Sequence, residues 1–219
     1  HANDCKDADC TDPSHNHRAK DATTASTRFG VTSFVYRARK PFNPERLTLF
    51  FKQLPLESEN PITLLDAARS VSVGEDESVE SESGEKTDLK DALKRLVRSK
   101  GFLWLANSDI AAMYWSHSGR YFEVQCLGRW WASIPQSDWP KNSQKSIKQD
   151  FEGSEGDRRQ ELVFIGFDIN NPKYKNEIVN GLNQCLLDDS EWAKYNEIRG
   201  NVSELREAFP SRIPIQIMM

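Results

Sequence analysis

Polar and apolar residues alternate in the segment 31–37, where β-branched and aromatic side chains predominate. This pattern predicts a β-strand with one buried face. Pro41 ends the alternation, and Asn43 and Pro44 then form a favourable helix start, because Asn caps well and Pro fits the first helical position. The apolar residues that follow recur at helical spacing: Leu47, Phe50, Phe51 and Leu54. We therefore predict a strand followed directly by a helix.

The pattern resumes at Asp88, which is a second favourable N-cap. A helical stripe of apolar residues follows it: Leu89, Leu93, Leu96 and Val97. We expect this helix to end at Gly101, and the apolar run 102–106 to form a short buried strand. Two further strands are predicted at 111–116 and 121–127, around a turn at Ser118 and Gly119. In the second of them, Phe122, Val124 and Cys126 fall on one face.

Residues 162–167 form the most apolar run of the chain and predict a central strand. The last amphipathic helix follows the breaker Asn171-Pro172, and its apolar residues are Ile178, Val179, Leu182, Leu186 and Leu187. This order of elements predicts the α+β class, with an antiparallel or mixed sheet covered by helices on one face. The nearest simple architecture is a ferredoxin-like sandwich with additions.

Three segments lie outside this pattern. Residues 1–28 are polar and lack periodicity, so we interpret them as a flexible linker that precedes a domain at 29–188. Ser, Glu and Asp dominate residues 57–87, which we expect to be a disordered acidic insertion because they offer little apolar surface to bury. Residues 189–219 are interpreted as a C-terminal tail.

The composition argues against several kinds of partner. The net charge is −4 and the sequence has no basic stripe, so we do not expect nucleic acid as a partner. No run of eighteen apolar residues occurs, so we expect no membrane partner. Four cysteines in 219 residues do not form a disulfide framework, which favours the cytoplasm or another reducing compartment. Since His1 is not Met and no signal-peptide pattern follows it, we expect the C-terminal part of a longer protein.

Metal-binding residue types gather near the start of the chain. The spacing is Cys-x4-Cys followed by His-x-His, formed by Cys5, Cys10, His15 and His17. Thiolate and imidazole are ligands that zinc prefers, and four of them complete a tetrahedral site. The segment is therefore a candidate site for labile metal binding; the alternative is a polar linker that binds no metal.

Motifs for catalysis are weak. Residues 84–87 carry only the last part of a P-loop, and no strand leads into them. His117 and Cys126 could pair, but Cys126 shares a face with apolar residues and is interpreted as buried and inert. We therefore expect no catalytic residue and no enzymatic activity in this chain.

Two short strings contain Trp and Arg, which are common anchors of protein interfaces. They supply Arg129, Trp130, Arg158 and Arg159 as candidate partner contacts. Alternatively, the Trp residues cap the core and the Arg residues pair with Asp157 or Glu161.

Five strings occur in the order found in one known family. They are residues 33–47 (SFVYRARKPF and PERL within it), 98–106 (RSKGFLWLA), 128–132 (GRWWA), 157–166 (DRRQELVFIG) and 185–187 (CLL). Over residues 31–188 the chain resembles the C-terminal domain of the CobW family of GTP-dependent metal chaperones. The resemblance is specific because all five strings occur across the domain in the same order as in the family.

The resemblance implies more than the residues show by themselves. Members of the family join a P-loop GTPase domain, which holds GTP and Mg²⁺, to this smaller domain and deliver zinc or cobalt, the latter in cobalamin synthesis. A His-rich stretch often lies between the two domains, where Cys5, Cys10, His15 and His17 stand here, although His is sparse in this chain. The implied partners are the GTPase domain of the same parent chain and a client metalloprotein. The alternative function is a protein–protein interaction domain without metal binding.

Overall fold

A six-stranded sheet forms the centre of the molecule, with strand order β1-β5-β2-β3-β4-β6. The computed structural model describes residues 28–56 and 88–217. The strands are β1 Val31–Ala38, β2 Leu96–Leu103, β3 Ala111–Ser118, β4 Tyr121–Arg129, β5 Gln160–Phe167 and β6 Ile215–Ile217. The first five pair antiparallel, and β6 joins β4 in parallel.

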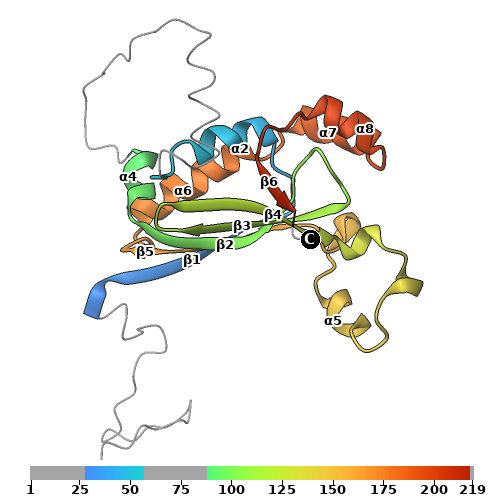
Figure 1. Ribbon diagram of the computed structural model, residues 1–219, viewed down its shortest axis with the longest axis horizontal. Coiled ribbons are helices and arrows are strands. Elements are labelled where there is room, and N and C mark those ends of the chain that lie inside the picture. Colours follow the sequence, from blue (N-terminus) through green and yellow to red (C-terminus); the bar gives the residue numbers. More distant parts are fainter. Residues whose placement is uncertain (1–27, 57–87, 218–219) are drawn as a thin grey trace, which may run out of the picture.

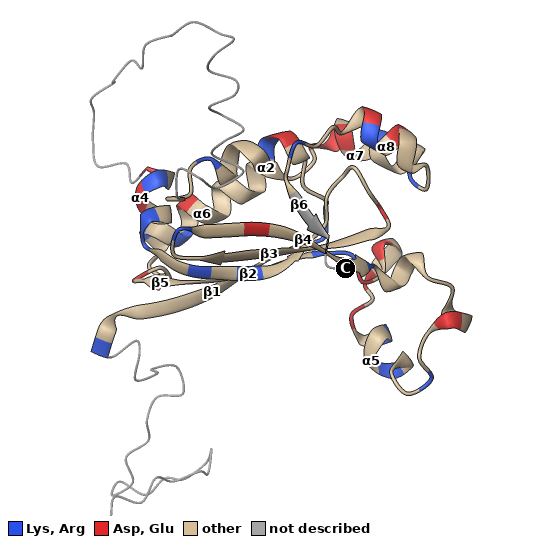
Figure 2. Ribbon diagram, in the orientation of Figure 1, with Lys and Arg blue, Asp and Glu red and all other residues tan. Residues whose placement is uncertain are grey.

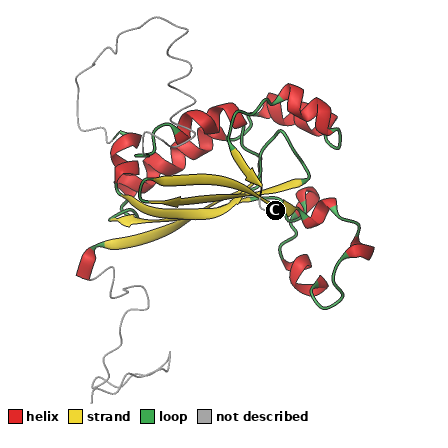
Figure 3. Ribbon diagram, viewed as in Figure 1, coloured by secondary structure: helices red, strands yellow, loops and turns green. Residues whose placement is uncertain are grey.

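Three helices cover one face of this sheet (Figures 1 and 3). They are α2 Pro44–Phe51, α4 Leu89–Lys94 and α6 Pro172–Cys185. Asn43 and Asn171 cap α2 and α6 through their side chains, and each cap is followed by a proline. The predicted α+β class, with a sheet covered by helices on one face, is confirmed.

The main core lies between the sheet and these helices. Trp115 of β3 is fully buried at its centre, and its ring packs edge-on against Phe51 of α2 at 5.0 Å between centroids. Its indole N–H donates to the buried Ser99 hydroxyl at 2.7 Å, so the polar atom of this large side chain is satisfied inside the core. These contacts bind α2 to the middle of the sheet.

Short helices fill the long connection between β4 and β5. They are the 3₁₀ turns η1 Trp131–Ser133, η2 Gln136–Asp138 and η3 Gly153–Glu155, and the helix α5 Gln144–Gln149. This connection forms a separate lobe at one end of the sheet in Figure 1.

A second, smaller core lies under the C-terminal helices α7 Asp189–Ile198 and α8 Val202–Ala208. Trp104 and Tyr195 are both fully buried there, with ring centroids 5.9 Å apart. The pattern of residues 189–219 suggested only a tail, whereas the structure contains α7, α8 and β6 in this segment. A local signal for α7 was present, because Asp188 and Glu191 form a capping box at its start.

The helix predicted between Asp88 and Gly101 is wrong in its second half. α4 ends at Lys94, and β2 begins at Leu96. The backbone leaves the helix because it pairs with β5: the Phe167 N–H donates to the Arg95 carbonyl at 3.0 Å, and further pairs follow along β2. Pairing with a distant strand thus overrides the local helical pattern. The strand predicted at 102–106 begins earlier, and residues 104–106 lie beyond its end.

Candidate functional site

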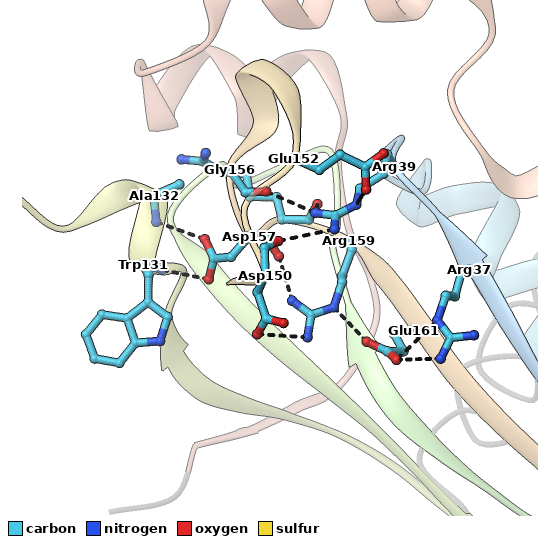
Figure 4. Close-up of polar contacts among 11 residues, drawn as sticks. Arg37, Arg39, Trp131, Ala132, Asp150, Glu152, Gly156, Asp157, Arg159 and Glu161 are labelled. Atoms are coloured by element: carbon cyan, nitrogen blue, oxygen red, sulfur yellow. Dashed lines mark hydrogen bonds and ion pairs between the residues drawn. The ribbon is translucent and has the colours of Figure 1, made fainter. Parts of the chain in front are cut away.

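The two Trp- and Arg-containing strings meet in the structure through Asp157 (Figure 4). Its carboxylate oxygens accept hydrogen bonds from the backbone N–H groups of Trp131 and Ala132, each at 2.9 Å. These groups begin the 3₁₀ turn η1, and a carboxylate satisfies such unpaired donors well. Asp157 therefore joins the segment after β4 to the segment before β5.

Arg39, just after β1, fastens the same loop. Its guanidinium donates to three backbone carbonyls, those of Gly156 at 2.9 Å, Arg158 at 3.2 Å and Asp150 at 3.2 Å. The Nε atom forms an ion pair with Glu152 at 3.1 Å. One side chain thus ties the end of β1 to most of the turn that leads into β5 (Figure 4).

Glu161 of β5 lies between two arginines. Arg159 donates to one of its oxygens at 2.7 Å, and Arg37 of β1 donates to the other at 3.0 Å. The hydrogen bond from Arg159, reinforced by the charges of both arginines, holds the pKa of Glu161 below its ordinary value. Arg159 also reaches Asp150 at 3.4 Å.

A groove of about 480 Å³ lies where β1 ends and β5 begins. Three arginines and three carboxylates face it: Arg37, Arg39, Arg159, Asp150, Glu152 and Glu161. Each arginine bonds a carboxylate of the same chain, so the charges of the groove are balanced internally. Of the three pairs, that of Arg159 with Glu161 is the least exposed to solvent, and such a charge-assisted bond is directional.

Arg158 has other surroundings than Arg159 and is only 4% exposed. Its Nε donates to the Asp109 carbonyl at 2.7 Å, and its Nη1 donates to the Glu155 carbonyl at 3.1 Å. Burial and the nearby charge of Arg199 lower the pKa of Arg158. Glu155 in turn pairs with Arg199 at 2.9 Å, which links this loop to the end of α7.

Two of the four predicted partner contacts are therefore revised. Trp130 is 3% exposed and packs near Phe102, and Arg158 is buried among backbone carbonyls, so neither side chain is presented to a partner. The alternative interpretation, in which the Trp residues cap the core, fits Trp130. The pairing that it gave to the Arg residues is found for Arg159, which bonds Glu161, and not for Arg158. Arg129 is exposed and donates to the Ser133 carbonyl at 2.9 Å, while Arg159 faces the groove. Partner contact stays a prediction for these two.

The predicted metal ligands Cys5, Cys10, His15 and His17 lie outside the described residues. Within 28–56 and 88–217, no group of three or more His, Cys, Asp or Glu side chains is placed to hold a metal ion. No helix in the same ranges has both the length and the apolar character needed to cross a membrane.

The two cysteines of the domain are free thiols in different settings. Cys185 is buried, and burial raises its pKa to about 12. Cys126 was expected to be buried but is partly exposed near the bulge of the β3–β4 hairpin, where its thiol contacts the Gly128 carbonyl at 3.7 Å. His117 pairs across the hairpin with Phe122, four residues from Cys126, so the structure does not bring His117 and Cys126 together.

Sequence reasoning missed the link between α2 and α7. Arg46 donates to Glu191 at 2.8 Å and to the Leu186 carbonyl at 2.8 Å, and Asn43 donates to Glu191 at 3.0 Å. These partners are more than 130 residues apart in the chain. The capping-box spacing from Asp188 to Glu191 was the only signal present in the sequence.

Comparison with known proteins supplies several similarities. The family model described as "Cobalamin synthesis protein cobW C-terminal domain" matches residues 70–186. "Zinc-regulated GTPase metalloprotein activator 1" of Dictyostelium discoideum is 31% identical over 164 residues, which cover 74% of this chain and 26% of that protein. The chain thus spans about a quarter of the length of this curated relative.

Two solved structures of YjiA GTPase also show a likeness. The Zn(II)-bound protein from E. coli has a TM-score of 0.39 at 14% identity, covering 80% of this chain and 35% of that chain. A Zn(II)-bound triple mutant of YjiA has a TM-score of 0.38 at 15% identity, covering 72% of this chain and 30% of that chain.

Proposed function

Because this chain belongs to the family of cobW C-terminal domains, we propose that it is the C-terminal module of a GTP-dependent metal chaperone. The observation that carries this proposal is the 31% identity to a zinc-regulated GTPase metalloprotein activator. Because the name of this relative specifies zinc, we favour zinc over cobalt as the metal that is carried. GTP and Mg²⁺ would be held by the GTPase domain of the parent protein.

The role of the module is to bind and to position. Ion pairs within the chain line the groove where β1 ends and β5 begins, and Arg159 faces it. Arg129, at the end of β4, is exposed. We assign to these two arginines contacts with the GTPase domain or with a client metalloprotein. Arg is suited to such contacts because its planar guanidinium can donate two hydrogen bonds to one carboxylate.

Metal handling belongs to the N-terminal segment in this proposal. Cys5, Cys10, His15 and His17 would act as auxiliary zinc ligands that hold the metal transiently. Their spacing is looser than that of a folded zinc knuckle, which suits a site from which the metal must leave. Thiolate ligands must stay reduced, so the proposal places the protein in the cytoplasm or another reducing compartment.

A zinc titration of the full chain tests the metal assignment. We expect micromolar binding that is lost in a Cys5→Ser, Cys10→Ser variant. Cys126→Ser is the matched control, because this thiol is partly exposed but lies in the folded domain. Binding that is equal in all three proteins would reject the four ligands and favour the alternative, an interaction domain that binds no metal.

A second measurement separates the module from an independent enzyme. We expect no GTP hydrolysis by this chain alone, because the P-loop is assigned to the parent's GTPase domain. Turnover that persists in a highly purified chain would contradict the proposal.

A further inference from the structure

The two edges of the sheet differ. At the β4 edge, β6 pairs with residues 124–126 and covers part of the strand. At the other edge, β1 pairs with β5 along its whole length, eight consecutive residue pairs without a bulge. Its outer side faces no other strand of the described chain. β1 is therefore a long and regular edge strand.

The register shows which backbone groups of β1 point outward. The Asp168 N–H donates to the Gly30 carbonyl at 2.8 Å, so residue 30 turns its backbone groups toward β5. In an antiparallel ladder this direction alternates, so even-numbered residues of β1 face β5 and odd-numbered residues face the free edge. The outward residues are Val31, Ser33, Val35 and Arg37. Their N–H and C=O groups bond no residue of the described ranges.

The usual protections of an edge strand are missing from β1. Natural edges are blunted by lysine, proline, a bulge or a very short strand. β1 has none of these, and in Figure 2 its ribbon is tan over most of its length. Its one charged residue, Arg37, is held by Glu161. On the face without helices, Val35 is 40% exposed and stands opposite Val163 of β5.

We propose that this edge pairs with β1 of a second copy of the chain, antiparallel and about a two-fold axis. The register centred on Phe34 places Val31 opposite Arg37 and Ser33 opposite Val35. All four outward residues of each copy are then paired, and the two sheets join into one.

The strand is self-complementary in this register, which is why a second copy is its partner. Arg37 meets a valine, so no like charges stand opposite each other, and Arg37 keeps its ion pair with Glu161. On the other face, Phe34 stands opposite Phe34 and Thr32 stands opposite Tyr36, so no charges meet there either. Phe34 and Tyr36 are already buried within each copy. No groove or pocket is required, because the backbone supplies the bonds.

Sedimentation of the full chain over a range of concentrations tests the proposal. We expect a monomer–dimer equilibrium that Val35→Lys abolishes, because lysine at the edge opposes strand pairing. Val163→Lys is the matched control: it places the same charge on the same face one strand inward and should leave the dimer intact. A chain that stays monomeric at every concentration, or a dimer equally weakened by both substitutions, overturns the proposal.

Amide hydrogen exchange gives a second readout that does not depend on substitution. The amides of Phe34 and Tyr36 bond β5 and should be protected at all concentrations. Those of Ser33 and Val35 should exchange roughly tenfold more slowly at high than at low concentration, since only the dimer protects them. A dimer in which these two amides exchange fast uses another surface and refutes the β1 assignment. Zinc binding by the N-terminal segment is unaffected by any of these outcomes.

Discussion

The side-chain amide of Gln160 bonds the backbone of Trp104 at both of its polar groups. Its Oε1 accepts the Trp104 N–H at 3.0 Å, and its Nε2 donates to the Trp104 carbonyl at 2.7 Å. Nε2 also donates to the Lys40 carbonyl at 3.0 Å. Gln160 is fully buried, and Trp104 comes directly after the end of β2. The Gln160 side chain therefore supplies hydrogen bonds to the Trp104 backbone just beyond the end of β2, where the strand pairing has stopped.

Replacing Gln160 with Met should destabilise the domain by about 2–4 kcal/mol, because it leaves the buried Trp104 N–H without a partner. Met has a similar length, so little packing volume is lost. The measurement is the free energy of unfolding in urea. Gln125→Met is the control: Gln125 lies on the open face and its side chain donates to Glu123, so its loss should stay within about 0.5 kcal/mol. Equal losses in the two variants would show that the Trp104 bonds contribute little.

Gly101→Ala should be among the most damaging single substitutions. A Cβ atom at this position would lie 1.8 Å from the backbone oxygen of Glu161, and the φ angle of Gly101 is +152°. Because neither backbone can move without breaking the β2–β5 ladder, we expect a loss of about 3 kcal/mol or more. Gly119→Ala is matched to it: φ is +61° but nothing lies within 4 Å. For Gly119→Ala we expect a loss of stability of about 1–2 kcal/mol, from backbone strain alone. Thermal unfolding followed by circular dichroism compares them, and similar midpoints would contradict the argument.

The ion pair between Arg46 and Glu191 should make stability depend on acid pH. The hydrogen bond from Arg46 lowers the pKa of Glu191 in the folded state. A lowered folded pKa contributes stability above the unfolded value, about 4.3, and this contribution is lost as pH falls through the folded value. Glu191→Gln should therefore reduce stability at pH 6 and flatten its dependence on pH below about 4.3. Glu197→Gln, on an exposed position of the same helix, should change neither. Urea unfolding between pH 3 and 7 gives both quantities, and parallel pH profiles for wild type and Glu191→Gln would reject the link.

His117 should affect the pH dependence of stability at higher pH than Glu191 does. It is 1% exposed, and burial lowers its pKa, so the folded state holds it neutral. The unfolded chain binds a proton near pH 6.5, so stability falls as pH drops below that value toward the lowered folded pKa. His117→Leu should make stability less dependent on pH below about 6.5, the ordinary value for His. A slope that His117→Leu does not change would assign the effect to other groups.

Short-range signals in the sequence were sufficient for several elements. Asn43 with Pro44, and Asn171 with Pro172, mark the starts of α2 and α6, because an N-cap bonds backbone groups only two or three residues away. The alternation in β4 likewise predicted that Phe122 and Val124 are buried, with Cys126 as the exception. Five strings, two of them around Trp130 and Arg158, resemble the family whose model matches residues 70–186.

The tertiary structure decided what depends on distant residues. Arg158 and Arg159 are neighbours with the same chemistry, yet one is buried and the other faces the groove. Their guanidinium groups bond different distant partners: Arg158 bonds the Asp109 carbonyl, and Arg159 bonds the Asp150 carboxylate. The end of α4 is set by β5, and the bond from Trp131 to Asp157 joins residues 26 apart. The sequence by itself determined caps, turns and alternation, since each of these depends on residues only a few positions apart in the chain. Burial, register and ion pairs required the folded structure, because their partners meet only when the sheet has formed.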